Sequence, residues 1–154
     1  MESHTLSLEE YCARMRHHPH QRAIGFELLE LTPGYAIGRI PYRAEFVGNP
    51  LTGVIHGGIV TTLLDAVGGA AVAGRCGKQL TMATLDLRID YLRPSKPQHD
   101  LFARVECYKL TRSVAFTRGV AYDAALDDPL AAMTATYMLN TPTQRRDDGK
   151  EPLV

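Results

Sequence analysis

The 154-residue chain has no tryptophan, only three cysteines and no excess of charge of either sign. Its 17 Lys and Arg residues balance 17 Asp and Glu residues, so the formal net charge is zero, whereas a nucleic-acid-binding protein normally carries a basic excess or patch. No run approaches the roughly 18 apolar residues of a membrane span, and the polar, acidic N-terminus is unlike a signal peptide. We therefore expect neither nucleic acid nor a membrane as a partner.

Cysteine chemistry and cofactor motifs are also scarce. The odd number of cysteines, at unrelated spacings, argues against a disulfide framework or a zinc site and favours a reducing compartment: Cys12, Cys76 and Cys107. Three histidines gather in MRHHPHQ, but Pro19 interrupts them and no Cys or carboxylate pattern supports a metal site. A GxSxG elbow and a nucleotide-binding glycine fingerprint are missing. We predict a cytoplasmic protein with no metal and no cofactor of its own.

The chain has the length of one domain, with 45% apolar and 22% charged residues, as is usual for a globular protein. Ser7 followed by Glu10 is a capping-box pattern that predicts a helix from residue 8 to about residue 18. The runs IGFELLEL and YAIGRIPY, separated by a Pro33-Gly34 turn, predict a hairpin. The segment RAEFVGNPLTG has no period and is expected to be a loop.

One long apolar helix is predicted next, because seven apolar residues fall at helical spacing before the GRCG segment of residues 74–77: Ile59, Val60, Leu63, Leu64, Val67, Ala70 and Ala71. After residue 79 the period becomes two, which predicts long strands in an antiparallel meander. In the first of them four apolar residues should share one face: Leu85, Leu87, Ile89 and Tyr91. We expect an α+β fold, an antiparallel sheet wrapped around one central helix, with an N-terminal helical segment (1–22), the main domain (23–140) and a polar tail (141–154).

The stretch VIHGGIVTTLLDAVGG contains the candidate chemistry. A helix N-terminus offers free backbone N–H groups, so His56-Gly57-Gly58 could hold a carbonyl oxygen that becomes negative, or could be only a tight turn. Asp65 is a poor residue for a helix interior. It lies either at a polar helix edge or in a cleft as a base or nucleophile. Eight residues, about 12 Å of helix, separate Gly57 from Asp65. If both act on one carbonyl, two antiparallel copies of the helix must share each site, and the protein must be at least a dimer.

The pattern HGG-x₆-LD, followed by strands ending in YLRP, resembles the hotdog-fold acyl-CoA thioesterases of the phenylacetate-degradation (PaaI-like) type. The similarity extends from about Gly25 to Leu139. It implies a hotdog fold, homodimers or dimers of dimers, and hydrolysis of an acyl-CoA to a free acid and coenzyme A. Coenzyme A is then part of the substrate.

The resemblance also implies roles for individual residues. Asp65 matches the catalytic carboxylate, a base or a nucleophile. Gly57 matches the residue whose N–H polarises the thioester carbonyl, and the His56 side chain helps to orient that carbonyl. Thr84 falls where some members place a hydroxyl that positions water. Asn49 resembles a family asparagine, but it lies seven residues before His56 instead of six, so either the loop has an extra residue or Asn49 has no catalytic part.

Further residues are candidates for binding the substrate. Gly58 is a candidate for substrate binding, and the helix residues Thr61, Leu64 and Gly68 would line the acyl pocket together with partner strands. Small residues at 68–71 would leave room for a bulky or aromatic acyl group. Arg93 and Arg112 follow or connect strands, where cations could meet the phosphates of coenzyme A. Two rival functions stay open on the same fold: a dehydratase or hydratase, and a non-catalytic acyl-CoA sensor.

Overall fold

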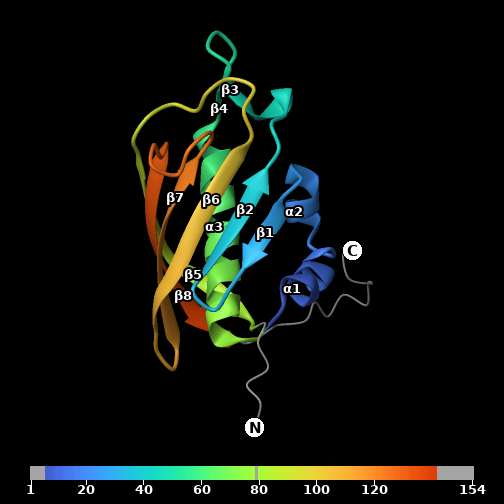
Figure 1. The fold of residues 1–154 in the computed structure, drawn as a ribbon, viewed down its shortest axis with the longest axis vertical. Coiled ribbons are helices and arrows are strands. Elements are labelled where there is room, and N and C mark those ends of the chain that lie inside the picture. The colour runs from blue at the N-terminus through green and yellow to red at the C-terminus, as the bar shows by residue number, and fades with distance from the viewer. Residues whose placement is uncertain (1–5, 79, 142–154) are drawn as a thin grey trace.

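A computed structural model describes residues 6–78 and 80–141 of the chain. One six-stranded antiparallel sheet, in the strand order β1-β2-β6-β7-β8-β5, curves around helix α3 (Gly57–Cys76), as Figure 1 shows. The predicted α+β architecture is confirmed. The strands of this sheet are β1 (Glu27–Leu31), β2 (Tyr35–Ile40), β5 (Met82–Tyr91), β6 (Leu101–Leu110), β7 (Val114–Tyr122) and β8 (Ala131–Leu139).

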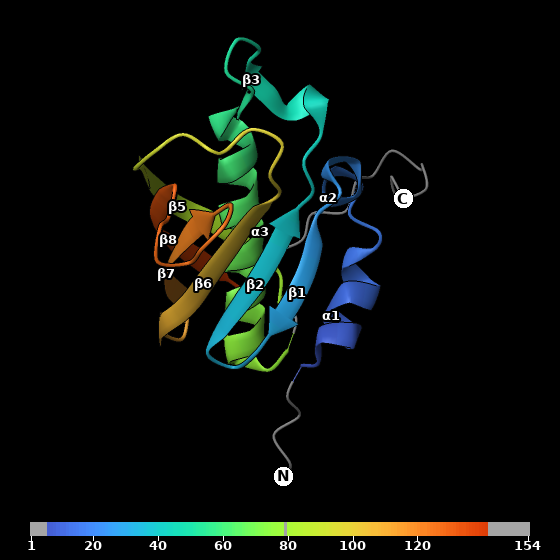
Figure 2. The same ribbon diagram turned by 45° about the horizontal axis from the view of Figure 1, so that its top comes forward.

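Two short helices precede the sheet, α1 (Leu8–Met15) and α2 (Pro19–Ile24). The predicted capping box is present, because the Glu10 N–H donates to Ser7 Oγ and the Ser7 N–H donates to the Glu10 carboxylate. The prediction of one helix to residue 18 is wrong. Proline disfavours helical backbone in the residue before it, and His18 is extended, so Pro19 starts a second helix instead. In Figure 2 both helices lie beside β1, at one edge of the sheet.

The segment predicted as a loop contains regular structure. A 3₁₀ turn, η1 (Ala44–Phe46), leads into a small two-stranded sheet of β3 (Val47–Asn49) and β4 (Val54–Ile55). The His56 N–H donates to the carbonyl of Phe46 at 2.8 Å, which ties this unit to the start of α3. The β3–β4 unit therefore fixes the direction in which α3 begins, at the top of Figure 1.

Helix α3 is the core of the domain. Its buried residues pack against the inner face of the sheet, where the alternating residues predicted from LFARVECYKL are all buried: Leu101, Ala103, Val105 and Cys107. By length and composition this helix of 20 residues could cross a membrane, contrary to the expectation that no run approaches that length. Its enclosure by the sheet accounts for the apolar composition. The helix ends at Cys76, and Gly77 adopts the left-handed conformation that caps it.

Strand β5 departs from the predicted meander. It pairs with β8 at the far edge of the sheet, not with its successor β6, and residues 92–100 cross from one to the other over the N-terminal end of α3 (Figure 1). Only β6, β7 and β8 form a meander. One side of β5 is thus left without a partner strand in the described chain.

A β-bulge in β5 overturns the predicted alternation. The register shifts between Thr84, opposite Tyr137, and Asp86, opposite Thr136, so that Leu85 is the extra residue. Strict alternation would place Thr84 on the outer face. Instead the bulge turns Thr84 to the inner face and leaves the side chain of Leu85 51% exposed. The position of Thr84 on the helix side of the sheet depends on this bulge.

Candidate active site

Asp65 is held by two hydroxyl groups from the sheet. Thr84 Oγ1 donates to Asp65 Oδ1 at 2.8 Å. The Tyr137 hydroxyl donates to the main-chain oxygen of Asp65 at 3.1 Å and lies 3.4 Å from Oδ1. Both contacts to the carboxylate involve Oδ1, and Oδ2 makes no hydrogen bond to any residue in the described ranges. One carboxylate oxygen is oriented and the other is left available.

Tyr137 reaches Asp65 because residue 68 is a glycine. A Cβ atom at Gly68 would overlap the Tyr137 hydroxyl, so Gly68 accommodates the tyrosine and does not line the cavity beside Asp65. Burial, with the nearby charge of Asp65, raises the pKa of Tyr137 far above its usual range and keeps the hydroxyl protonated. We did not predict this residue from the sequence. The available signal was a tyrosine on the buried face of a strand, since a buried tyrosine hydroxyl needs a partner.

At the start of α3 the backbone N–H groups of Gly57 and Gly58 differ in their hydrogen bonding. The Gly58 N–H donates to Nδ1 of His56, the N-cap residue, at 2.9 Å. Within the described chain no acceptor meets the Gly57 N–H. Because Nδ1 of His56 accepts a hydrogen bond, the ring proton of the neutral imidazole is on Nε2. The arrangement presents one free backbone donor, that of Gly57, beside an exposed imidazole.

A tyrosine from β5 fixes the first turn of the helix. The Tyr91 hydroxyl donates to the Gly57 carbonyl at 2.8 Å, and Thr61 Oγ1 donates to the same carbonyl at 3.1 Å. Thr61, which was expected to line the acyl pocket, therefore stabilises the first turn of α3. Tyr91 is 54% exposed, and sequence reasoning gave it no part in the site. The Tyr91 hydroxyl thus positions Gly57, whose N–H is the candidate donor to the thioester carbonyl oxygen.

Gly57 and Asp65 lie on one uninterrupted helix. Their separation of eight residues corresponds to about 12 Å along the axis, so they cannot meet at one carbonyl carbon within a single chain. The geometric condition behind the predicted dimer is therefore met in this structure.

Asp65 opens onto a cavity of about 690 Å³ between the N-terminal helices, α3 and the edge of the sheet. Gly69, one helical turn beyond Asp65, lines it, and a Cβ atom there would meet only Met82 Sδ at 3.7 Å, an ordinary contact. Leu64, a predicted pocket residue, is fully buried in the core instead. The remaining lining residues are Tyr11, Met15, His18, Gln21, Ala66, Leu80, Thr81, Met82, Thr84, Tyr137 and Thr141.

Asn49 is the exposed last residue of β3, at the start of the β3–β4 connection. Its Oδ1 accepts the Leu51 N–H at 3.0 Å, and its main-chain oxygen accepts the Gly53 N–H at 2.8 Å. The asparagine thus stabilises the turn of its own loop. These contacts do not join Asn49 to Asp65 within the chain.

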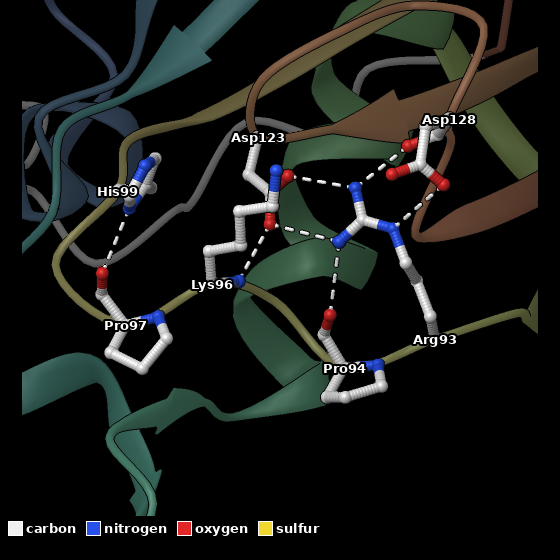
Figure 3. Close-up of polar contacts among 7 residues, drawn as sticks. All are labelled: Arg93, Pro94, Lys96, Pro97, His99, Asp123 and Asp128. Carbon is white, nitrogen blue, oxygen red and sulfur yellow. Dashed lines mark hydrogen bonds and ion pairs between the residues drawn. The ribbon is translucent and has the colours of Figure 1, made fainter.

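Arg93 is part of a dense polar cluster, shown in Figure 3. Its guanidinium donates to both carboxylate oxygens of Asp123, at 2.8 and 3.1 Å, and to the Asp128 carboxylate at 3.1 Å. The carbonyls of Pro94 and Asp128 accept its other N–H groups at 3.0 and 2.7 Å. All five donors are used, which favours a structural role over the predicted phosphate contact. Arg112 is exposed in the β6–β7 turn, a full length of β6 away.

The histidine cluster gives no metal centre in the residues the structure describes. Across residues 6–78 and 80–141, no three His, Cys, Asp or Glu side chains come together in a way that could hold a metal ion. His18 precedes α2 and lines the Asp65 cavity.

A sheet wrapped around one helix, with a carboxylate in mid-helix and a glycine turn at its start, is the architecture of a hotdog protein. The model of the thioesterase superfamily matches residues 52–128, which include Gly57, Asp65 and Thr84. The chain belongs to the thioesterase superfamily.

Relatives along most of the chain agree. The medium/long-chain acyl-CoA thioesterase YigI of Salmonella typhimurium is 30% identical over 138 residues, 80% of this chain and 86% of YigI. A Halobacterium salinarum protein is 37% identical over a shorter stretch of 76 residues, and this match spans 50% of that protein. These matches place the chain among enzymes that cleave thioesters.

Solved structures agree as well. A Pseudomonas aeruginosa protein superposes with a TM-score of 0.77 at 34% identity, covering 85% of this chain and 97% of that one. The phenylacetic acid degradation protein PaaI of Thermus thermophilus superposes with a TM-score of 0.67 at 28% identity, covering 78% and 97%. The predicted likeness to PaaI-like hotdog proteins is confirmed.

Proposed function

We propose that the protein hydrolyses acyl-CoA thioesters to a free acid and coenzyme A, in sites shared between two subunits. The observation that carries this proposal is the state of Asp65, whose Oδ1 is held by hydroxyl groups while Oδ2 is free at the edge of a large cavity. The relatives named acyl-CoA thioesterase support the choice of coenzyme A as the leaving group.

In the proposed reaction a water oxygen attacks the thioester carbonyl carbon while Asp65 Oδ2 takes the water proton. The Gly57 N–H of the partner subunit donates to the carbonyl oxygen as it becomes negative, a contact worth about 3–4 kcal/mol in acyl-transfer sites. The C–S bond then breaks, and the sulfur leaves with a proton as coenzyme A. In the alternative route Asp65 itself attacks, and water hydrolyses the resulting anhydride. Hydrolysis in ¹⁸O-labelled water under single-turnover conditions identifies the second route when the label appears in Asp65, which requires water to attack the Asp65 carbonyl carbon of the anhydride.

The exposed edge of β5 supports a dimer. A ten-residue edge strand without a partner is a site for pairing with another chain unless it is blunted. Next to this edge, three large apolar side chains are about half exposed: Leu85, Tyr91 and Leu92. Asp65 (through Thr84) and Gly57 (through Tyr91) both contact this strand. Pairing at β5 would bring the start of one α3 towards the middle of the other.

The proposal includes no metal and no cofactor, because a thioester carbonyl needs only water, a base and a donor for the oxyanion. Free thiols support a cytoplasmic location, since such groups persist in reducing compartments: Cys12, Cys76 and Cys107. The dehydratase and sensor alternatives both predict that no thiol is released from any acyl-CoA.

The first test is thiol release from short, medium, long and aromatic acyl-CoAs by the wild type and by Asp65→Ala. Loss of a positioned base should lower kcat by about 10²-fold or more with the fold retained. If the wild type releases no thiol from any substrate, the proposed function is wrong. If Asp65→Ala is as fast as the wild type, another residue is the base.

Complementation tests the shared site. Gly57→Pro removes the N–H at the first helical position, which tolerates proline, and each of Gly57→Pro and Asp65→Ala should be inactive alone. A mixed dimer of the two has one doubly damaged site and one intact site. Because random pairing makes half of the dimers mixed, we expect about a quarter of wild-type activity from the mixture. No recovery in dimers shown to be mixed would place both groups in the same subunit's site.

A further inference from the structure

A second cavity lies next to the one at Asp65. It occupies about 540 Å³ between α1, the start of α2 and strand β1. Three residues line both cavities: Tyr11, Met15 and Gln21. These three residues, all from α1 and α2, form the wall that the two spaces share.

Gln21 is the least secured of the three residues in this wall. Met15 has a flexible, unbranched side chain that adapts to different neighbours. The Oε1 atom of Gln21 is buried and has no hydrogen-bond partner, the only such buried side-chain atom in the described residues. A buried amide oxygen without a partner destabilises its own position. Displacement of the Gln21 and Met15 side chains would connect the two cavities, while Tyr11 is buried in the core.

Apolar side chains form part of the lining of the second cavity. Strand β1 and the residue before it supply Phe26, Leu28 and Leu29, and α1 supplies Cys12. Charged groups are at its margins: Arg16, Arg22 and Glu27, all exposed. The apolar part of this lining suits a hydrocarbon chain.

We propose that the acyl chain of the substrate starts at Asp65, passes Gly69 and the Met15–Gln21 wall, and ends in the second cavity. The preferred substrates are then thioesters of long, unbranched fatty acids, and the N-terminal helices set the upper chain length. This inference rests on the proposed thioesterase function. The α1, α2 and β1 residues lie outside the segment 52–128 that the superfamily model matches.

A chain-length series tests the route. We would compare kcat/KM for butyryl-, octanoyl-, dodecanoyl- and palmitoyl-CoA in the wild type, in Leu29→Trp and in Leu126→Trp. Leu29 lines only the second cavity and is 43% exposed, so a larger side chain can enter that space. Leu126 is 46% exposed in the β7–β8 turn, away from both cavities, and is the matched control.

In the wild type each added methylene that enters the cavities should raise kcat/KM about fourfold, until the second cavity is full. Leu29→Trp should lower the ratio of the palmitoyl to the octanoyl value by at least tenfold, whereas Leu126→Trp should keep the wild-type ratio. Equal ratios in all three proteins, or a wild type active only on butyryl-CoA, would overturn the proposed route. Absence of thiol release from every substrate would instead refute the thioesterase function itself.

Fluorescence gives a second readout that does not depend on turnover. The chain has no tryptophan, so the side chain introduced by Leu29→Trp would be the sole indole of that variant. In an Asp65→Asn background, palmitoyl-CoA should shift the emission of the introduced indole to shorter wavelength, and butyryl-CoA should not. The Leu126→Trp control should respond to neither. A response to both ligands, or to coenzyme A alone, would show that the second cavity takes the coenzyme arm and would overturn the proposal.

Discussion

Two aspartates of this chain have opposite surroundings. Asp123 is 4% exposed, and both of its carboxylate oxygens meet the guanidinium of Arg93, while the Lys96 N–H donates to one of them at 2.6 Å. The Arg93 hydrogen bonds hold the pKa of Asp123 below its usual range. Asp65 is half-buried, and the donors to its carboxylate among the described residues are two neutral hydroxyl groups, both on Oδ1.

The difference separates a carboxylate that holds the fold from one that is available for chemistry. Around Asp123 (Figure 3) both carboxylate oxygens accept hydrogen bonds, and the cluster joins the end of β5 to the β7–β8 turn. Around Asp65 the protein orients the group and leaves one oxygen free. The Arg93 cation holds the buried Asp123 carboxylate in its charged form and in its position. The Asp65 carboxylate, whose donors are neutral, can instead take up a proton or attack a carbon.

The largest effect on stability should come from removing the Asp123 carboxylate. Asp123→Ala leaves the Arg93 guanidinium without its main partner, so we expect a loss of about 3 kcal/mol in the free energy of unfolding, measured by urea denaturation. The activity of the molecules that remain folded should change little. Asp65→Ala should show the reverse, with less than about 1 kcal/mol lost and activity abolished. If Asp123→Ala and Asp65→Ala lower the free energy of unfolding equally, the two aspartates do not differ in their structural role.

Two adjacent glycines, Gly68 and Gly69, allow a test of how Tyr137 is positioned at Asp65. Gly68→Ala forces the Tyr137 hydroxyl away from Asp65 and should cost about 1–3 kcal/mol by overpacking, together with a lower kcat. Gly69→Ala is the matched control, because its Cβ meets only Met82 Sδ and alanine favours the helix by up to about 1 kcal/mol. Differential scanning calorimetry should therefore show Tm changes of opposite sign. A rise for both would mean that Tyr137 does not depend on Gly68.

A smaller effect is expected from pH. The folded-state pKa of Asp123 is below its unfolded value of about 3.9, so its stabilisation is complete above that value and is lost as the pH falls through the folded pKa. The difference in the free energy of unfolding between the wild type and Asp123→Asn should be constant near neutral pH and should decrease below about pH 4. Urea titrations at several pH values measure it. A difference that is unchanged in acid would show that Asp123 is not charged in the folded protein.

The sequence predicted the fold well where periodicity was unbroken. The helix at α3 and the alternation along β6 followed directly from spacing, and they are confirmed. The errors lie where a local event interrupts the pattern. Pro19 divides the N-terminal helix, the bulge at Leu85 reverses part of β5, and β5 itself pairs with β8, a contact between distant parts of the chain that no local period encodes.

The candidate site shows the same limit. Asp65 and Thr84 could be selected from the sequence, and the structure joins them by a hydrogen bond, although their catalytic roles remain predictions. Tyr137 and Tyr91 were missed because their hydroxyl contacts depend on strand register and on a glycine in the facing helix. Arg93 was selected for its charge, but its partners come from a turn 30 residues later in the chain. Residue type predicts chemistry, and tertiary contacts decide which groups are free to perform it.

The smallest effect should come from the single hydroxyl that orients the free carboxylate. Thr84→Val keeps the shape of the side chain and removes the hydrogen bond to Asp65 Oδ1, whose net value is about 1 kcal/mol, so kcat should fall about fivefold with KM unchanged. Thr84→Ser keeps the donor and should restore kcat. Steady-state kinetics on the best acyl-CoA measures both variants. A fall in Thr84→Ser as large as in Thr84→Val would assign Thr84 to packing, and Asp65 would then be oriented by Tyr137 alone.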